Sequence, residues 1–263
     1  MLKKLSLFSK NRTKAYLAFA DRDPVFGARM ATLEKAHGFG PDTEFYLEEP
    51  LVGDAQGIVA RFYGTVYLSA EENRDPLFAL SYLKRCPYWL ALEGRDTLIR
   101  PLAKELGVTH LETSWCMLHD GKTFPDISGF DVRKSENLPR FFEILSACHA
   151  GFRDNTNYRL WFEDYAARIG SGDTELFFLY EKDTPVACAT VNVRNRKNAV
   201  IGSVSTLPGY RGKGRGRAVS AAALLRIREA GLQASLQCSE DSLSAFYEPL
   251  GFEKSFRWMI AER

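Results

Sequence analysis

The sequence predicts an α/β fold in which a mixed, twisted sheet is flanked by helices. Two observations support this prediction. Apolar residues alternate between strand-like and helix-like spacing along the whole chain, and a glycine-rich loop joins a strand to a helix in the second half. The chain has 263 residues, 45% of them hydrophobic, which suffices for one large or two modest domains. We therefore expect two α/β units, residues 1–125 and 126–263, joined by the turn-rich stretch at 120–125.

The first half alternates helices and strands. Asp75 and Pro76 combine an N-cap residue with a proline at the first helical position, and Gly107 ends a later apolar stripe. In chain order we expect helices at 13–20 and 26–37, strands at 44–48 and 57–68, a helix after Asp75, a strand at 88–92, a helix after Asp96 and a strand at 110–118.

The second half begins a fresh pattern after the turn-rich stretch. Its first helix carries apolar residues at helical spacing, and Asp183 to Pro185 marks a hairpin turn. We expect a strand at 127–134, two helices ending near Cys148 and Ile169, strands at 175–181, 186–194 and 198–205, a helix at 217–230, a strand at 232–239, a short helix and a last strand at 252–261.

The loop between the strand at 198–205 and the following helix is dense in glycine and cationic residues. Glycines let successive backbone N–H groups point into one concavity, and the helix behind adds the positive end of its dipole. This arrangement predicts an anion site, most naturally for a phosphate or pyrophosphate. The loop lacks the Gly-Lys-Ser/Thr of a Walker loop and the third glycine of the dinucleotide fingerprint. It matches Arg-x-x-Gly-x-Gly at Arg211, Gly214 and Gly216.

A second motif, Ala-Phe-Tyr-Glu-Pro-Leu-Gly-Phe, occupies residues 245–252. Gly251 suits the left-handed position that ends a short helix. Together, the two motifs make the C-terminal half resemble the GNAT superfamily of N-acetyltransferases, whose acyl-coenzyme A loop and following short helix occur in this order. The chain departs from the family at Glu240, where many members have asparagine, and a carboxylate there cannot donate a hydrogen bond to the pantetheine arm.

The resemblance implies a GNAT fold and acetyl-CoA as cosubstrate, with no metal. It implies that backbone groups at one strand end line the pantetheine arm, that the loop holds the phosphates, and that Tyr247 protonates the leaving thiolate. The coenzyme-binding residues so implied are Val204, Ser205, Thr206, Arg211, Gly212, Lys213, Gly214, Arg215, Gly216 and Arg217. The function implied is transfer of an acetyl group to a primary amine of a small molecule or peptide; a non-catalytic acyl-CoA sensor or partner-binding protein is the alternative.

The general base and the acceptor are left open by the sequence. A primary amine near pKa 10.4 is almost fully protonated at pH 7, so help with deprotonation is expected. Glu175, Glu181 and His149 lie in the relevant half, but no pattern places any of them at the thioester. The polar and aromatic connection at 151–158 is expected to form a wall of the acceptor pocket.

The first half is expected to be a degenerate GNAT-like copy, with an unrelated α/β accessory domain as the alternative. We place its counterpart of the coenzyme loop at 93–96, where one glycine stands beside Glu93 and Asp96. Carboxylates repel phosphate, so this half is expected to bind no coenzyme, and each chain is expected to take up one.

Composition narrows the remaining possibilities. The formal net charge is +2, from 35 Lys+Arg against 33 Asp+Glu, so neither nucleic acid nor an acidic membrane surface is an expected partner. Aromatic residues do not interleave the basic loop, which disfavours an RNA-binding module. The five cysteines show no metal-ligand spacing, and reduced thiols in a cytoplasmic protein are expected. Composition leaves the oligomeric state open.

Overall fold

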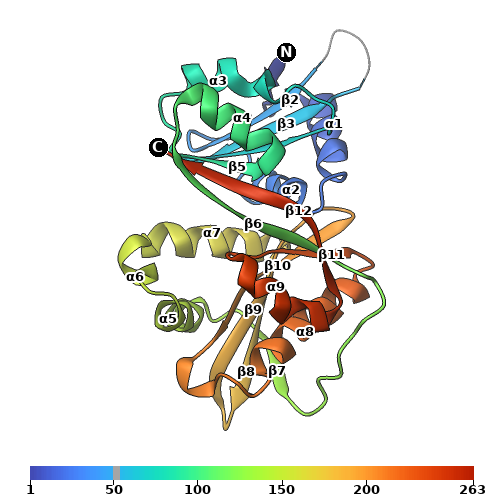
Figure 1. The fold of residues 1–263 in the computed structure, drawn as a ribbon, viewed down its shortest axis with the longest axis vertical. Coiled ribbons are helices and arrows are strands. Elements are labelled where there is room, and N and C mark those ends of the chain that lie inside the picture. The colour runs from blue at the N-terminus through green and yellow to red at the C-terminus, as the bar shows by residue number, and fades with distance from the viewer. Residues whose placement is uncertain (50–53) are drawn as a thin grey trace.

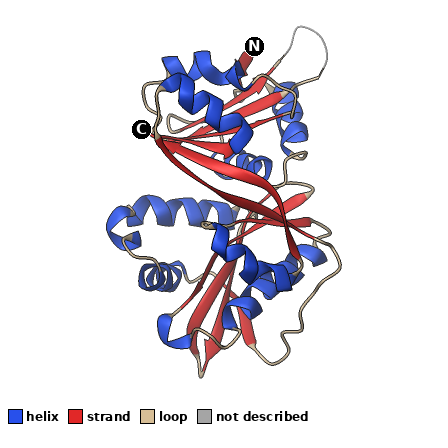
Figure 2. Ribbon diagram, viewed as in Figure 1, coloured by secondary structure: helices blue, strands red, loops and turns tan. Residues whose placement is uncertain are grey.

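In the computed structural model, which describes residues 1–49 and 54–263, one sheet of twelve strands runs through the whole molecule, with helices on both faces (Figures 1 and 2). The expected α/β fold is confirmed. The strands are β1 Leu2–Lys4, β2 Thr43–Glu48, β3 Gly57–Phe62, β4 Thr65–Ala70, β5 Ala91–Arg95, β6 His110–His119, β7 Asp131–Ser135, β8 Glu175–Glu181, β9 Thr184–Arg194, β10 Asn198–Thr206, β11 Gln233–Gln237 and β12 Phe252–Glu262.

The helices fall into two groups, one around each half of the sheet. The α-helices are α1 Lys10–Ala20, α2 Phe26–His37, α3 Leu80–Arg85, α4 Asp96–Leu106, α5 Leu138–Cys148, α6 Phe152–Asn155, α7 Tyr158–Gly170, α8 Arg215–Glu229 and α9 Ser244–Tyr247. Short 3-10 turns are η1 Pro76–Ala79, η2 Pro208–Tyr210, η3 Asp241–Leu243 and η4 Glu248–Leu250.

The two halves repeat one topology. Strands β1 to β4 are antiparallel neighbours, and β5 then joins β4 in parallel. Strands β7 to β10 are likewise antiparallel, and β11 joins β10 in parallel. A parallel neighbour requires a crossover, which η1 and α3 provide in the first half and α8 provides in the second.

The halves exchange strands at the centre of the sheet, whose order is β1-β2-β3-β4-β5-β12-β6-β11-β10-β9-β8-β7. The last strand of the chain, β12, pairs with β5 of the first half, as in Met259 opposite Gly94. Strand β6, which ends the first half, pairs with β11, as in Leu236 opposite Met117. Figure 1 shows β6 and β12 running side by side between the two lobes. Each lobe is therefore completed by a strand from the other half of the chain.

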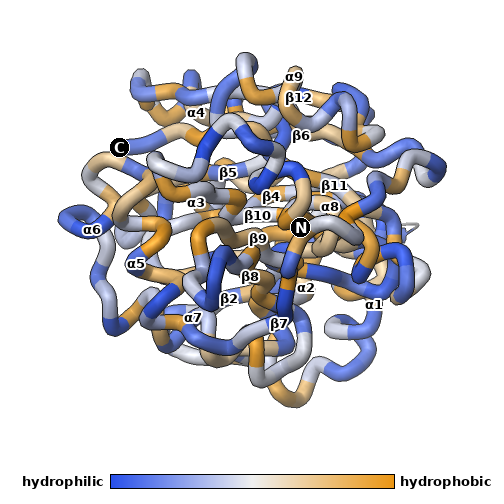
Figure 3. Tube along the Cα trace, turned by 90° about the horizontal axis from the view of Figure 1, so that it is seen from below, coloured by the Kyte–Doolittle hydropathy of each residue, from blue (hydrophilic) through white to orange (hydrophobic). Residues whose placement is uncertain are grey.

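Each face of the sheet has its own apolar core. In the second half α8 covers one face through Val219, Leu224 and Ile227, while α5 covers the other through Phe141 and Leu145. In the first half α1 and α2 pack on one face and α3 and α4 on the other. Hydrophobic stretches accordingly follow the central strands, and hydrophilic ones the outer turns (Figure 3). These cores fix where β10 and its loop lie.

One predicted strand divides in two. Residues 57–68 were expected as a single strand, but β3 and β4 form a hairpin in which Phe62 pairs with Thr65. The intervening residues are Tyr63 and Gly64, and Tyr63 adopts φ 48°. An aromatic residue in this left-handed conformation gives no turn signal in an apolar run, whereas Asn-Gly would have done so.

Candidate acyl-transfer site

The two parallel strands β10 and β11 part in the middle of the second half. Their pairing ends at Ile201 opposite Leu236. Just beyond, Ser203 has φ 53° and the register between β10 and β9 shifts, which marks a β-bulge. The bulge bends β10 away, so Val204, Ser205 and Thr206 have no ladder partner on the β11 side. These are the residues that the resemblance predicted to line the pantetheine arm.

The glycine-rich loop follows the parted strand. Gly212 and Gly214 adopt φ 79° and 75°, conformations that favour glycine. Gly214 is the N-cap residue of α8, and no side chain caps this helix. A Cβ added at Gly216 would lie 3.2 Å from Thr206 Oγ1, so glycine lets the first turn of α8 approach the end of β10. The uncapped N–H groups therefore face the loop with no side chain bonded to them.

The four cationic residues of the loop have different surroundings. Arg215 is tied into the protein, because Nε donates to Glu181 Oε1 at 2.7 Å and Nη1 to Tyr210 O at 3.1 Å. Arg211 Nε donates to Thr206 O at 3.0 Å. Lys213 and Arg217 are exposed, and the Arg217 guanidinium lies over the Phe246 ring. Lys213 and Arg217 are thus better placed than Arg215 to meet a phosphate.

Tyr247 lies at the end of α9, close to Cys238, the residue that follows β11. Its ring packs edge-on against Phe246 and Phe252. Burial, and secondarily the Cys238 thiol, raises the pKa of Tyr247 well above its usual value. The phenol therefore stays protonated at neutral pH and can donate a hydrogen bond.

The start of the α9 region anchors it to the exchanged strands. The Asp241 side chain accepts from Ser114 Oγ on β6 at 3.0 Å and from Arg257 Nη1 on β12 at 3.1 Å. Glu240 accepts only from Ser242 Oγ, at 3.1 Å, among the residues that the structure describes. Gly251 has φ 84° and ends the segment as expected. Residues from both halves thus hold the helix that carries Tyr247.

Two of the three candidate bases are engaged with cations. Glu181 pairs with Arg215. Glu175 accepts from Arg226 Nε at 3.0 Å and pairs with Lys134 at 2.9 Å. Burial pushes the pKa of Glu175 upward, but the hydrogen bonds from Arg226 and Lys134 outweigh it, so its pKa is lowered. Glu175 is therefore a poor proton acceptor, and the Glu181 carboxylate is occupied by Arg215.

The third candidate, His149, contacts the parted strand. Its Nε2 lies 2.8 Å from Ser205 Oγ, while the rest of the side chain is exposed at the end of α5. Partial burial, and then the nearby Arg211 charge, lowers the pKa of His149, so the imidazole is neutral at pH 7. The two residues are 56 positions apart, and the sequence carries no signal that pairs them.

The first-half counterpart of the coenzyme loop is not where the sequence placed it. Because β4 corresponds to β10, the equivalent connection is the one between β4 and η1, residues 71–75. Residues 93–95 instead form the end of β5, which corresponds to β11, and Asp96 begins α4. The error arose because 57–68 was taken as one strand, which shifted the alignment of the two halves by one element. The true counterpart contains Glu71, Glu72 and Asp75 and no glycine.

A cleft of about 670 Å³ lies at this position in the first half. Its walls carry charges of both signs, including Glu71, Glu72, Arg95 and Arg257. Arg95 stacks 4.0 Å from the centroid of Phe256, a residue of β12. The cleft therefore differs from the loop before α8 in that acidic side chains line it together with basic ones.

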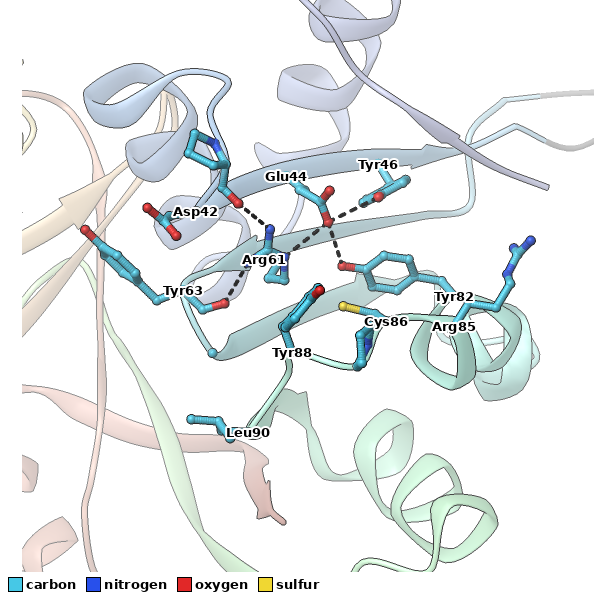
Figure 4. Close-up of a pocket in the computed structure, with 13 residues that line it drawn as sticks. Asp42, Glu44, Tyr46, Arg61, Tyr63, Tyr82, Arg85, Cys86, Tyr88 and Leu90 are labelled. Carbon is cyan, nitrogen blue, oxygen red and sulfur yellow. Dashed lines mark hydrogen bonds and ion pairs between the residues drawn. The ribbon is translucent and has the colours of Figure 1, made fainter.

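A larger cavity of about 1000 Å³ opens elsewhere in the first half (Figure 4). Figure 4 shows Tyr46, Tyr82 and Arg61 converging on Glu44. Burial raises the pKa of Glu44, but hydrogen bonds from Lys4 and Arg61 outweigh burial and lower it. Both tyrosine hydroxyls lie 3.3 Å from Glu44 Oε2. The polar floor of this cavity is therefore satisfied internally, and the cavity is far from the parted strands.

Comparison with known proteins agrees with this geometry. Residues 138–252 match the family model described as the acetyltransferase (GNAT) family. These residues form a GNAT acetyltransferase domain within the second half of the chain. Acyl transfer is the general chemistry that this family and fold support, and the family generally uses acetyl-CoA. No curated protein sequence matches the chain.

Solved structures extend the GNAT fold to the whole chain. A GCN5-related N-acetyltransferase from Kribbella flavida has a TM-score of 0.63 at 15% identity, covering 92% of this chain and 95% of that one. A tandem GNAT protein from the clavulanic acid biosynthesis pathway has a TM-score of 0.61 at 16% identity and covers 100% and 98%. An acetyltransferase of the GNAT family from Colwellia psychrerythraea has a TM-score of 0.60 at 15% identity and covers 100% and 99%. The two-lobed layout is thus a tandem GNAT arrangement.

Proposed function

We propose that the protein transfers the acetyl group of acetyl-CoA to a primary amine of a small molecule or peptide, using the GNAT domain in its second half. The observation that carries the proposal is the uncapped start of α8, preceded by Gly212 and Gly214 in left-handed conformations and lying beside the parted strands. This combination offers an anion site next to a slot for an extended thiol arm.

The donor would bind along this slot. Backbone N–H groups from Gly212 to Gly216 would hold the pyrophosphate, and Lys213 and Arg217 would meet the remaining phosphate. The pantetheine arm would run beside Val204, Ser205 and Thr206, whose edges have no strand partner. Arg211 and Arg215 would shape the loop, because Arg211 donates to the carbonyl of Thr206 at the end of β10 and Arg215 to that of Tyr210 within the loop.

The reaction would be a direct displacement at the thioester carbonyl. The neutral amine attacks the carbonyl carbon, a C–N bond forms and the C–S bond breaks, giving the amide and the thiolate of coenzyme A. The amine loses one proton and the thiolate gains one, so an alkylammonium and acetyl-CoA give amide, free thiol and one released proton. A backbone N–H of the parted strand would stabilise the oxyanion, an interaction worth about 3 kcal/mol.

Tyr247 and His149 would handle these protons. A phenol near pKa 10 is a weaker acid than a thiol near 8.5, and burial raises the pKa of Tyr247 further. Hydrogen bonding to the developing thiolate is therefore a stronger role for Tyr247 than complete proton transfer. His149 is neutral at pH 7 and exposed beside Ser205, so it can accept a proton directly or through water.

A second function, an acyl-CoA sensor or partner-binding protein without catalysis, would use the same loop. It would need neither a protonated phenol nor a neutral imidazole near the parted strands, and both are present.

A cytoplasmic location fits the five free thiols. Among the described residues no helix has both the length and the apolar character needed to cross a membrane.

A thiol-release assay tests the proposal. The full chain is incubated with acetyl-CoA and panels of primary amines, amino acids and short peptides, and free coenzyme A thiol is measured against a no-acceptor blank. We expect acceptor-dependent release together with a mass increase of one acetyl group on the acceptor. Tight acetyl-CoA binding without release from any panel would instead favour the sensor.

A further inference from the structure

Helix α2 of the first half brings an arginine to the parted strands of the second. The Arg29 guanidinium donates from Nη2 to Gln237 Oε1 at 3.1 Å and lies 5.4 Å from the centroid of the Tyr67 ring. Helix α2 also touches the second half through Ala28, which packs against Val193 and Val200. Figure 1 shows α2 at the junction of the lobes, above α7. Arg29 therefore belongs to the junction between the two lobes.

Arg29 forms no direct ion pair within the part of the chain that the structure describes, although the charge of Glu93 acts on it. No carboxylate of residues 1–49 and 54–263 forms a salt bridge with it, Nε is enclosed without an acceptor, and Nη1 has no protein acceptor but is not enclosed. Burial opposes its charge, yet Glu93 and three other groups raise its pKa, so it stays cationic. A half-buried cation with free donors is costly to maintain, and an anionic ligand would offset that cost.

A carboxylate stands on the other side of the same glutamine. Gln237 Nε2 donates to Glu93 Oε1 at 3.0 Å, and Glu93 Oε2 has no protein donor among the described residues. The amide of Gln237 thus holds a cation and an anion apart, with one terminal atom of each left free. Arg29, Glu93 and Gln237 are all half-buried, and we refer to them as the Arg29–Gln237–Glu93 set.

The set lies where the acceptor must approach. Gln237 is the first residue of β11 beyond its last pairing with β10. Its side chain shares a face of the sheet with Ser235, whose hydroxyl bonds to Pro24 O at the start of α2. On that face Tyr165 of α7 bonds to Ser203 Oγ at 3.0 Å, at the bulge. Helix α8, which would hold the donor phosphates, covers the opposite face.

We infer that the Arg29–Gln237–Glu93 set binds the acceptor as a zwitterion, so that the acceptor is a free α-amino acid. The carboxylate would bind Nη1 of Arg29, and the ammonium group would donate to Glu93 Oε2 before it loses its proton. The inference deepens the proposed function and rests on it. It also gives the first half a positioning role in the reaction, because Arg29 and Glu93 both come from that half.

Matched acceptors distinguish this inference from the broader function. Each of the common L-amino acids is compared with its own α-carboxamide in the thiol-release assay and by isothermal titration in the presence of coenzyme A. We expect at least one free amino acid to bind and to be acetylated, and its carboxamide to lose about 30- to 1,000-fold in affinity, because Arg29 then lacks its anion. Binding is a readout that needs no turnover.

Three variants then locate the effect. Arg29→Gln should raise KM for the amino acid by about 30- to 1,000-fold and leave KM for the carboxamide nearly unchanged. In Arg29→Lys the KM for the amino acid should lie between the values of the wild type and of Arg29→Gln. Lysine keeps the positive charge but lacks the planar guanidinium that can bind a carboxylate through two N–H groups. Arg22→Gln removes an exposed arginine of the same half that pairs with Glu71, and should change neither value. Thermal unfolding checks that each variant folds.

The inference and the proposed function fail in different ways. Acetylation of carboxamides or simple amines with no preference for free amino acids would overturn the zwitterion site and keep the acetyltransferase. An equal increase in KM for the amino acid and for its carboxamide in Arg29→Gln would also overturn the zwitterion site. Absence of turnover with every acceptor, but amino-acid binding that Arg29→Gln removes, would support the site and count against catalysis. Absence of amino-acid binding to the wild-type chain would overturn the inference directly.

Discussion

The loops at 207–214 and 71–75 occupy the same place in two copies of one fold, and they differ in how the next helix begins. Before α8 no side chain caps the helix, and Gly212 and Gly214 leave its N–H groups open. Before η1 the Asp75 carboxylate accepts from Leu77 N at 2.9 Å. The first half thus fills its anion site with its own side chain, and Glu71 and Glu72 add negative charge beside it. We propose that these two loops separate a ligand-binding lobe from a supporting one.

The strand exchange sets a limit on that separation. Strand β12 pairs with β5 and β6 of the first half, and β6 pairs with β11 of the second. The lobes therefore differ in their loops and share their central strands.

The largest effect should come from cutting the chain into its halves. Residues 127–263 expressed alone should be insoluble or unfolded. In this fragment β11 loses β6, one of its two neighbours, and β12 loses both of its neighbours, β5 and β6. Circular dichroism and size-exclusion chromatography measure this. The matched control is the full chain carrying a protease site in the connection at 121–126, which should remain one folded particle after cleavage. A soluble, active fragment 127–263 would show that the exchange is dispensable.

Next in size is the loss of donor binding in Gly214→Asp. The variant should bind acetyl-CoA at least about 100-fold more weakly, because a carboxylate would enter the phosphate site, as Asp75 does in the first half. The strain at φ 75° should cost about 1–2 kcal/mol, which a folded domain tolerates. Gly121→Asp is the control, since Gly121 has φ 73° in open space outside the loop. Wild-type affinity in Gly214→Asp, measured by titration, would remove the loop from the coenzyme site.

Removal of the Tyr247 hydroxyl should have a smaller effect. Tyr247→Phe should lower kcat by about 10- to 1,000-fold with little change in acetyl-CoA affinity, because the hydrogen bond to the thiolate forms only as the thioester breaks. Tyr210→Phe removes a hydroxyl from the loop and should leave kcat nearly unchanged. Single-turnover kinetics isolate the chemical step, and an unchanged rate there would exclude Tyr247 from the mechanism.

His149→Gln should have the smallest effect on catalysis, about tenfold in kcat/KM at neutral pH, since water can replace it in part. The pKa of His149 is lowered from 6.5, so the base is available at neutral pH and is lost as the pH falls through that lowered pKa. The wild-type rate should therefore show an acid limb below pH 6.5 that His149→Gln lacks. A limb that survives in the variant would assign it to another group.

The sequence predicted the loop, the helix after it and the order of elements in the second half because these depend on local chemistry. The fixed spacing of glycine and arginine identifies Gly214 and Arg211 as loop residues, and no tertiary information is needed for this. The left-handed turn at Gly251 was predictable for the same reason. The turn at Tyr63 was missed because a tyrosine in a left-handed conformation is fixed by the hairpin around it, and that error displaced the counterpart loop.

The contacts across the molecule could not be predicted. Ser205 and His149, or Arg29 and Gln237, are brought together by the packing of α5 and α2 on the sheet, and no spacing in the chain encodes such pairs. The sequence does not predict the exchange of β6 and β12 either, because each strand has the same apolar alternation whichever neighbour it pairs with. At Arg215 the sequence suggested a contact with a phosphate. The structure pairs this arginine with Glu181, a partner that the sequence did not indicate.

Isothermal titration of the full chain with acetyl-CoA tests the contrast between the lobes most directly. We predict a single class of sites with a stoichiometry near one, abolished by Gly214→Asp and unaffected by Glu72→Gln in the first-half loop. A stoichiometry near two, or binding that survives Gly214→Asp and is lost when Glu71 or Glu72 is changed, would contradict the account.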